Sequence, residues 1–90
     1  MTAKILCDIL AERKYQDEMW GTRFDDNNTI NDWVTHIVKY CGRATVFEAD
    51  PENQREAMIK VAALAVAALE TFDRNGRFAP RHYENLVKKD

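Results

Sequence analysis

The stretch REAMIKVAALAVAALETF, residues 55–72, decides the fold, because it is rich in helix-forming residues and every position from Val61 to Leu69 is apolar. A helix that is apolar on all sides must be covered on all sides. Small side chains that allow neighbouring backbones to approach closely recur along it, at Ala62, Ala63, Ala65, Ala67 and Ala68. The sequence therefore predicts an all-α fold with a buried helix over residues 51–73.

Both ends of this helix carry recognisable signals. Asp50 is a preferred N-cap residue, Pro51 suits the first helical position, and Glu52 meets the positive end of the helix dipole. Gly76 is the expected stop. The following segment APRHYENLVKK, residues 79–89, is expected to form a short fourth helix.

Apolar spacing predicts two further main helices, over residues 3–20 and 30–45. Gly21 is expected to end the first, and the loop TRFDDNNT follows it. Thr29 and Asp32 have the spacing of a capping box at the start of the second. The predicted apolar faces are Ile5, Leu6, Ile9 and Leu10 on the first helix, and Ile30, Trp33, Val34, Ile37, Val38 and Cys41 on the second.

The chain has 90 residues, of which 46% are hydrophobic, so residues 1–90 are expected to form a single helical domain. A domain of this size has a thin core, and self-association is a common remedy. We therefore expect a homo-oligomer that completes the helical bundle through the helix at 51–73. The alternative is that this helix is central and covered by its own chain.

Charge and composition exclude several classes of protein. The net charge of −2 argues against non-specific nucleic-acid binding. No apolar stretch of about 18 residues exists, and Asp8 interrupts the apolar start, so neither a signal peptide nor a membrane span is expected. Cys7 and Cys41 are interpreted as core residues in a reduced, cytoplasmic setting.

The segment ERKYQDEMWG, residues 12–21, is unusually polar for a helix that must contribute to a core. Glu12, Gln16 and Trp20 lie at i, i+4 and i+8, so they share one edge and offer an acceptor, an amide and an indole to a flat heterocycle. The competing interpretation is a solvated face with ion pairs between Arg13 and Asp17 and between Lys14 and Glu18.

The polar side of the second helix carries a similar candidate surface. Lys39 and Tyr40 lie three and four positions after His36, and Arg43 lies three positions after Tyr40, so these residues face one way and can present cations and a ring to a phosphate or a base. A solvated helix face is the alternative. In the loop FDDNNT, residues 24–29, oxygen donors suggest a metal site, although turn formation explains such loops more often.

Five segments together resemble one family: ERKYQDEMWG, FDDNNT, NDWV, YCGRA and REAMIKVAALAVAALETFDR. They look like those of the small, mostly phage-encoded MazG-like proteins, relatives of the all-α nucleoside triphosphate pyrophosphohydrolases, over about residues 5–74. The resemblance implies an all-α oligomer that handles a nucleotide, with the polar edge of the first helix near the site.

The chain departs from the catalytic members of that family in its acidic motifs. Those members resemble one another in two acidic pairs, Glu-x-x-Glu and Glu-x-x-Asp, that hold magnesium against the phosphates. This chain contains no Glu-x-x-Glu, and its one Glu-x-x-Asp, Glu70 with Asp73, lies at the end of a helix. We therefore expect the protein to bind and sequester a phosphorylated nucleotide or a nucleotide-derived signal, without a required cofactor, as in phage anti-defence. The predicted ligand residues are Glu12, Gln16, Trp20, Lys39, Tyr40 and Arg43.

Two other functions remain open at this point. The first is Mg²⁺-dependent hydrolysis of a nucleoside triphosphate to the monophosphate, for which a metal site must be assembled from carboxylates. Its candidate ligands are Glu12, Glu18, Asp25 and Asp26. The second is a purely structural or protein-binding role.

Overall fold

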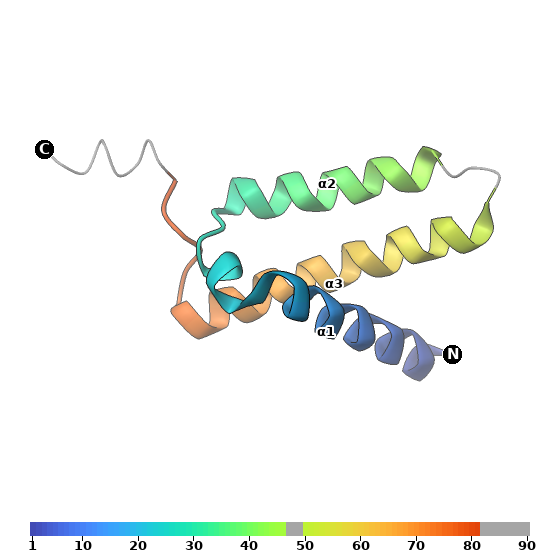
Figure 1. Ribbon diagram of the computed structural model, residues 1–90, viewed down its shortest axis with the longest axis horizontal. Helices are drawn as coiled ribbons and strands as arrows, with labels where there is room; N and C mark the ends of the chain where they lie inside the picture. The colour runs from blue at the N-terminus through green and yellow to red at the C-terminus, as the bar shows by residue number, and fades with distance from the viewer. Residues whose placement is uncertain (47–49, 82–90) are drawn as a thin grey trace, which may run out of the picture.

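The computed structural model describes residues 1–46 and 50–81, and within them the chain is all-helical. Three helices, α1 (Thr2–Asp26), α2 (Ile30–Val46) and α3 (Pro51–Asn75), make up the fold (Figure 1). The described residues include no β-strand, and Thr29 and Ala79 form one isolated β-bridge. The all-α prediction is confirmed, whereas the fourth helix expected at 79–89 falls mainly outside the described residues.

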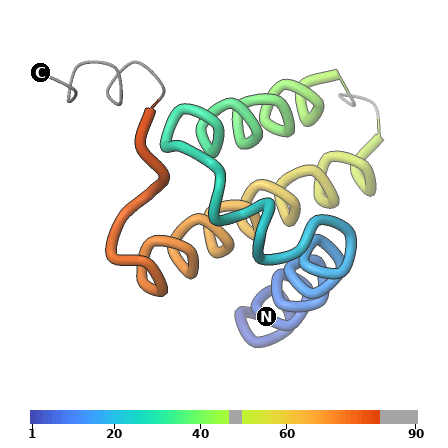
Figure 2. The backbone as a smooth tube through the Cα atoms, turned by 60° about the vertical axis from the view of Figure 1, so that its left-hand side comes forward, coloured from blue at the N-terminus to red at the C-terminus, as the bar shows by residue number. Residues whose placement is uncertain are grey.

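Helix α3 lies between the other two helices and packs against both of them (Figure 2). Helix α2 runs antiparallel to α3, while α1 crosses α3 and runs in the same general direction (Figure 1). Two ion pairs follow this parallel course, from Asp8 with Arg55 near the start of both helices to Asp26 with Arg74 near their ends. The apolar stretch predicted to be buried is therefore the central element.

The core forms where α2 meets α3. Its buried members are Trp33, Leu64, Ala67 and Ala68, with Ile37, Tyr40 and Phe78 packed against them. The alanines give α2 room to approach α3 closely, as their small size predicts. Leu69, at the end of the apolar stretch, remains 61% exposed in the single chain.

The predicted capping signals of α2 and α3 are confirmed. Thr29 N donates to Asp32 Oδ2 at 3.0 Å and Asp32 N donates to Thr29 Oγ1 at 3.1 Å, which is a reciprocal capping box. Asn53 N donates to Asp50 Oδ1 at 3.3 Å at the start of α3. Gly76 ends α3 in the left-handed conformation, with φ 75° and ψ 0°.

Helix α1 is longer than the sequence predicted. Gly21 interrupts it with φ 78° and ψ 170°, as a terminator would, but the chain returns to a helix up to Asp26. Distant partners stabilise this extra turn: Asp25 pairs with Arg13, and Asp26 pairs with Arg74. The prediction of a loop directly after Gly21 is therefore wrong, because local sequence does not reveal those partners.

Much apolar surface of the single chain is exposed. The cysteines Cys7 and Cys41 are exposed, so their interpretation as core residues is wrong for this chain alone. The predicted stripes are only partly covered, since the exposed apolar side chains include Ile5, Leu6, Leu10, Ile30, Val34 and Val38. No helix in the described part of the chain is both long enough and apolar enough to span a membrane.

Candidate functional site

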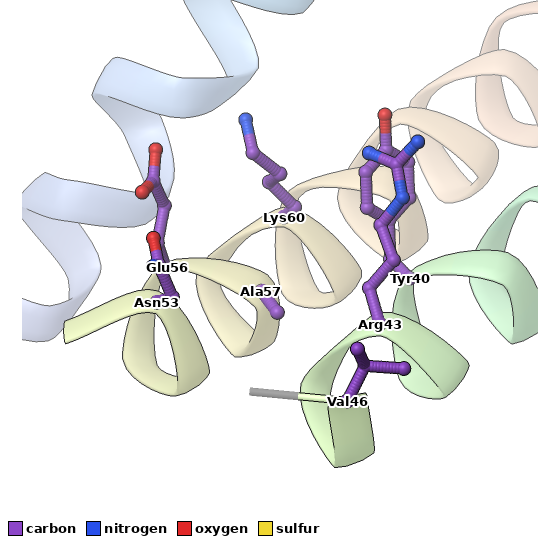
Figure 3. Close-up of a pocket in the computed structure, with 7 residues that line it drawn as sticks. All are labelled: Tyr40, Arg43, Val46, Asn53, Glu56, Ala57 and Lys60. Atoms are coloured by element: carbon purple, nitrogen blue, oxygen red, sulfur yellow. The ribbon is translucent and has the colours of Figure 1, made fainter. Parts of the chain in front are cut away.

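A groove opens between the last turns of α2 and the first turns of α3, and we call it the α2–α3 groove (Figure 3). Its cavity volume is about 260 Å³. The residues that line it are Tyr40, Arg43, Val46, Asn53, Glu56, Ala57 and Lys60. Ala57 is buried, and its small side chain leaves the space between the helices open.

Cationic groups and an aromatic ring meet in this groove. The Arg43 guanidinium carbon lies 5.0 Å from the centre of the Tyr40 ring, which is cation–π distance. Lys60 projects from α3 in the same direction as the Arg43 side chain from α2 (Figure 3). The groove therefore presents the Arg43 guanidinium stacked on the Tyr40 ring, while the Lys60 ammonium is paired with Glu12 and the Glu56 carboxylate also lines the groove.

Glu12 of α1 connects this groove to a second cavity. Both of its carboxylate oxygens lie 3.4 Å from Lys60 Nζ, and Gln16 Nε2 donates to Glu12 Oε2 at 3.2 Å. Lys60 belongs to the α2–α3 groove, whereas Gln16 lines the second cavity. Within the predicted edge of α1, Glu12 therefore links the two cavities, while Gln16 and Trp20 line the second one.

The second cavity lies where all three helices meet, and we call it the three-helix cleft. Its volume is only about 20 Å³, room for one water-sized group. Its lining residues are Arg13, Gln16, Trp20, Phe24, Asp25, Trp33, His36, Leu64 and Ala67. Aromatic rings follow one another at its wall, since Trp20 and Phe24 lie 5.6 Å apart and Phe24 and His36 lie 6.0 Å apart between ring centres.

Two buried polar atoms of the cleft have no hydrogen-bond partner among the described residues. They are Gln16 Oε1 and Trp33 Nε1, on side chains of residues that are 4% and 2% exposed. The orientation of the Gln16 amide follows from chemistry, because the Glu12 carboxylate accepts hydrogen bonds and must face the NH₂ group. Both atoms are fully buried behind the wall of the cleft and are not open to it.

A buried ion pair closes the side of the cleft near the end of α1. Arg13 Nη2 lies 3.0 Å from Asp25 Oδ2, and Arg13 Nε lies 2.6 Å from Glu70 Oε1. Burial raises the pKa of the Asp25 carboxyl, and the charge of Arg13 opposes that rise. The ion pair with Arg13 thus offsets part of the free-energy cost of burying the Asp25 carboxylate.

The residues predicted as metal ligands do not converge in the single chain. Three of them face cations: Glu12 faces Lys60, Asp25 faces Arg13, and Asp26 faces Arg74. The fourth, Glu18, is exposed. Within residues 1–46 and 50–81, no group of three or more His, Cys, Asp or Glu side chains is placed to hold a metal ion.

Four of the six predicted ligand residues line one of the two adjacent cavities. Gln16 and Trp20 line the three-helix cleft, and Tyr40 and Arg43 line the α2–α3 groove. Lys39 is not among the residues that line either cavity, although its Nζ atom lies 5.9 Å from the centre of the Tyr40 ring. His36 and Tyr40 are one turn apart on α2, as are Lys60 and Leu64 on α3, so the cavities succeed one another along the helices.

Sequence reasoning did not identify most of the residues that line these cavities, and two of them carry polar groups that bear on the site. Lys60 is a lone cation between Ile59 and Val61, and a charge within such an apolar segment is a signal that could have identified it. Trp33 was predicted as a core residue, and it is one, but its unpaired Nε1 atom is a property of the packed structure.

Comparison of the chain with known protein families, with curated proteins and with solved structures gives no match.

Proposed function

We propose that the protein binds a phosphorylated nucleotide, or a signalling molecule derived from one, in the α2–α3 groove. The observation that carries this proposal is the meeting of Arg43, Lys60 and the Tyr40 ring around one open cavity. Arginine and lysine side chains bind phosphate, and an aromatic ring provides a stacking surface. Sequestration of a host signal by a phage-encoded protein is the biological setting that the family resemblance adds.

A second copy of the chain is part of this proposal. The groove volume of about 260 Å³ lies below the range of about 300 to 1,000 Å³ typical of ligand pockets. The single chain also exposes many large apolar side chains, among them Leu6, Leu10, Met58, Leu69 and Phe72. Large apolar side chains exposed to water favour association, and a homo-oligomer formed through α1 and α3 would cover them.

Native mass spectrometry of protein taken directly from cells tests both parts together. We expect a mass that is a multiple of 10.5 kDa, with a retained small molecule that contains phosphate. A mass of 10.5 kDa at micromolar concentration would contradict the oligomer, and the absence of any retained or added nucleotide would contradict binding. Release of pyrophosphate from a nucleoside triphosphate with Mg²⁺ would instead favour the enzymatic alternative.

The site itself is tested by removing one cation. Arg43→Ala should weaken binding of the retained molecule about tenfold to hundredfold, because a hydrogen bond to a charged group is lost. Arg77→Ala is the matched control, since Arg77 is an exposed arginine that follows the far end of α3 and does not line the groove. Calorimetry at two salt concentrations should show a weaker salt dependence for Arg43→Ala than for the wild type. Equal affinities for the two variants would contradict the assignment.

A further inference from the structure

One side of α3 belongs neither to its contact with α1 nor to its contact with α2. The ion pairs with α1 are made by Arg55, Lys60, Glu70 and Arg74. The apolar contact with α2 is made by Leu64, Ala67 and Ala68. A further set of apolar residues, which we call the α3 seam, is partly or largely exposed and consists of Met58, Ala62, Ala65, Leu69 and Phe72. They recur at intervals of four and three residues in turn, which is the spacing of a helix face that packs along another helix.

We infer that the α3 seam is the contact between two copies of this chain, in which the two α3 helices pack antiparallel about a two-fold axis. This inference rests on the homo-oligomer of the proposed function and specifies its geometry. The axis passes between residues 63 and 64, so Met58 of one copy lies level with Leu69 of the second copy. Ala62 lies level with Ala65 of the second copy for the same reason.

Charges beside the seam decide the direction of the two helices. Positions 55 and 73 are about five helical turns apart, so Arg55 and Asp73 project from the same edge of α3 at opposite ends of the seam. An antiparallel contact sets Arg55 of each copy level with Asp73 of the other. A parallel contact would instead oppose Arg55 to Arg55 and Asp73 to Asp73. Opposite charges attract and like charges repel, so the antiparallel arrangement is favoured.

Both charged groups have capacity for this additional pair. Asp73 has no hydrogen bond or ion pair within the part of the chain that the structure describes. Arg55 Nη2 lies 2.7 Å from Asp8 Oδ2, and the guanidinium group has further N–H donors. A two-fold contact requires a surface that is complementary to itself. An apolar seam with a cation at one end and a carboxylate at the other meets this requirement, which identifies the partner as a second copy.

The sizes of the seam side chains also fit an antiparallel contact. Alanines meet at its centre, where small side chains allow two helices to approach closely. Phe72 lies on the α2 side of the seam, because its ring contacts Phe78, which packs against the α2–α3 core. The two-fold axis sets this ring level with a hollow of about 440 Å³ in the second copy, which is lined by Ala44, Thr45, Gln54 and Met58. The hollow thus provides space for the largest side chain of the seam.

Cysteine cross-linking of the full chain tests both the surface and the direction. The exposed Cys7 and Cys41 are first replaced by serine, and Met58→Cys and Leu69→Cys are then made separately and together. We expect the double variant to form a covalent dimer on mild oxidation and each single variant to remain uncross-linked. Identical positions are about 16 Å apart along the antiparallel axes, as are the two cysteines within one chain, which is too far for a disulfide.

A charge in the seam provides the second measurement. Leu69→Glu should weaken self-association at least about a hundredfold, because the second copy would bury an unpaired carboxylate. Val38→Glu is the matched control, since Val38 is exposed on α2 and does not belong to the seam, and its mass should equal that of the wild type. Light scattering at micromolar concentration gives the masses, and circular dichroism verifies the helix content. The cross-linking result decides the question if Leu69→Glu fails to fold.

Distinct results would overturn the inference and the proposed function. Cross-linking of the single variants would show a parallel contact, and a dimeric double variant that does not cross-link would place the contact elsewhere. Self-association of a folded Leu69→Glu variant at the strength of the wild type would do the same. Each of these results overturns the inference and leaves nucleotide binding intact.

Two measurements on the wild type complete the separation. A mass of 10.5 kDa at micromolar concentration would overturn the inference together with the oligomer of the proposed function. A wild type that cross-links as expected, but binds no nucleotide in calorimetry, would support the inference and contradict the binding proposal alone.

Discussion

The contact between α1 and α3 differs in chemistry from the contact between α2 and α3, although both cover the same central helix. Ion pairs join α1 to α3 at four places: Asp8 with Arg55, Glu12 with Lys60, Arg13 with Glu70, and Asp26 with Arg74. The α2–α3 contact is built instead from Trp33, Leu64, Ala67 and Ala68. Helix α3 therefore contacts α1 through a series of ion pairs and contacts α2 through apolar packing.

The two contacts are therefore expected to have different roles, one mainly in stability and the other mainly in positioning side chains. Burial of apolar side chains is the dominant favourable contribution to folding, so the α2–α3 contact should contribute most of the stability. Exposed ion pairs contribute little free energy, but their order along two helices fixes one alignment. The α1–α3 contact thus places Glu12 and Gln16 beside the two cavities. The polar segment of α1 has a structural function in addition to the proposed recognition of a ligand.

The largest expected effect is on the apolar side. Leu64→Ala should lower the free energy of unfolding by about 2 to 5 kcal/mol, because it leaves a cavity in the core. Val38→Ala is the control on α2, since Val38 is 59% exposed and lines neither cavity. In urea unfolding, this control should change the free energy of unfolding by no more than about 0.5 kcal/mol. An effect of Val38→Ala as large as that of Leu64→Ala would contradict the view that the buried α2–α3 contact supplies most of the stability.

The next effect concerns the buried ion pair of α1. Arg13→Met should destabilise the protein by about 1 to 3 kcal/mol at neutral pH, because the buried Asp25 carboxylate loses its partner. Adding Asp25→Leu to this variant should recover much of the loss, since no unpaired charge remains. Urea unfolding of the single and double variants measures both values. A double variant less stable than the single one would contradict this account of Asp25.

The pH dependence of the Arg13→Met variant follows from the same burial. Burial raises the pKa of Asp25 above its ordinary value of 3.8, so the folded state binds more protons than the unfolded state between the two values. This group therefore favours folding more as the pH falls through the pKa of the folded state. The destabilisation of the variant should be smaller at about pH 5 than at neutral pH.

Local signals in the sequence were sufficient for most of the fold. Asp50, Gly76 and the Thr29–Asp32 box mark helix ends through contacts between residues close in sequence, and they were predicted correctly. The extra turn of α1 was missed because it depends on Arg13 and Arg74, which are distant in sequence from their partners. Partners that lie far along the chain leave no periodic pattern to detect.

The candidate site was less predictable than the fold. The pairing of Tyr40 with Arg43 follows from their spacing on one helix, and the structure places both in one groove. The contribution of Lys60 requires knowledge of how α3 aligns with α1 and α2. The unpaired state of Trp33 Nε1 depends on every neighbour of the ring, so sequence patterns do not contain it.

The smallest expected effect is at the exposed end of the α1–α3 contact, where Asp26 and Arg74 pair. Hydrogen bonds from Arg74 and Asn75 hold the pKa of Asp26 below its ordinary value of 3.8. This group therefore stabilises the folded state above that value, and the contribution is lost as the pH falls through the lower pKa of the folded state. Arg74→Met should remove this contribution and should destabilise the protein less than Arg13→Met.

High ionic strength should affect the stability changes of Arg74→Met and Arg13→Met differently. Salt at about 1 M screens exposed charges strongly and buried pairs much less. In urea unfolding, the difference between Arg74→Met and the wild type should therefore disappear at high salt, whereas that of Arg13→Met should persist. If high salt abolished both differences, the Arg13–Asp25 pair would be as accessible to ions as the exposed one. The distinction between a buried and an exposed part of the α1–α3 contact would then be wrong.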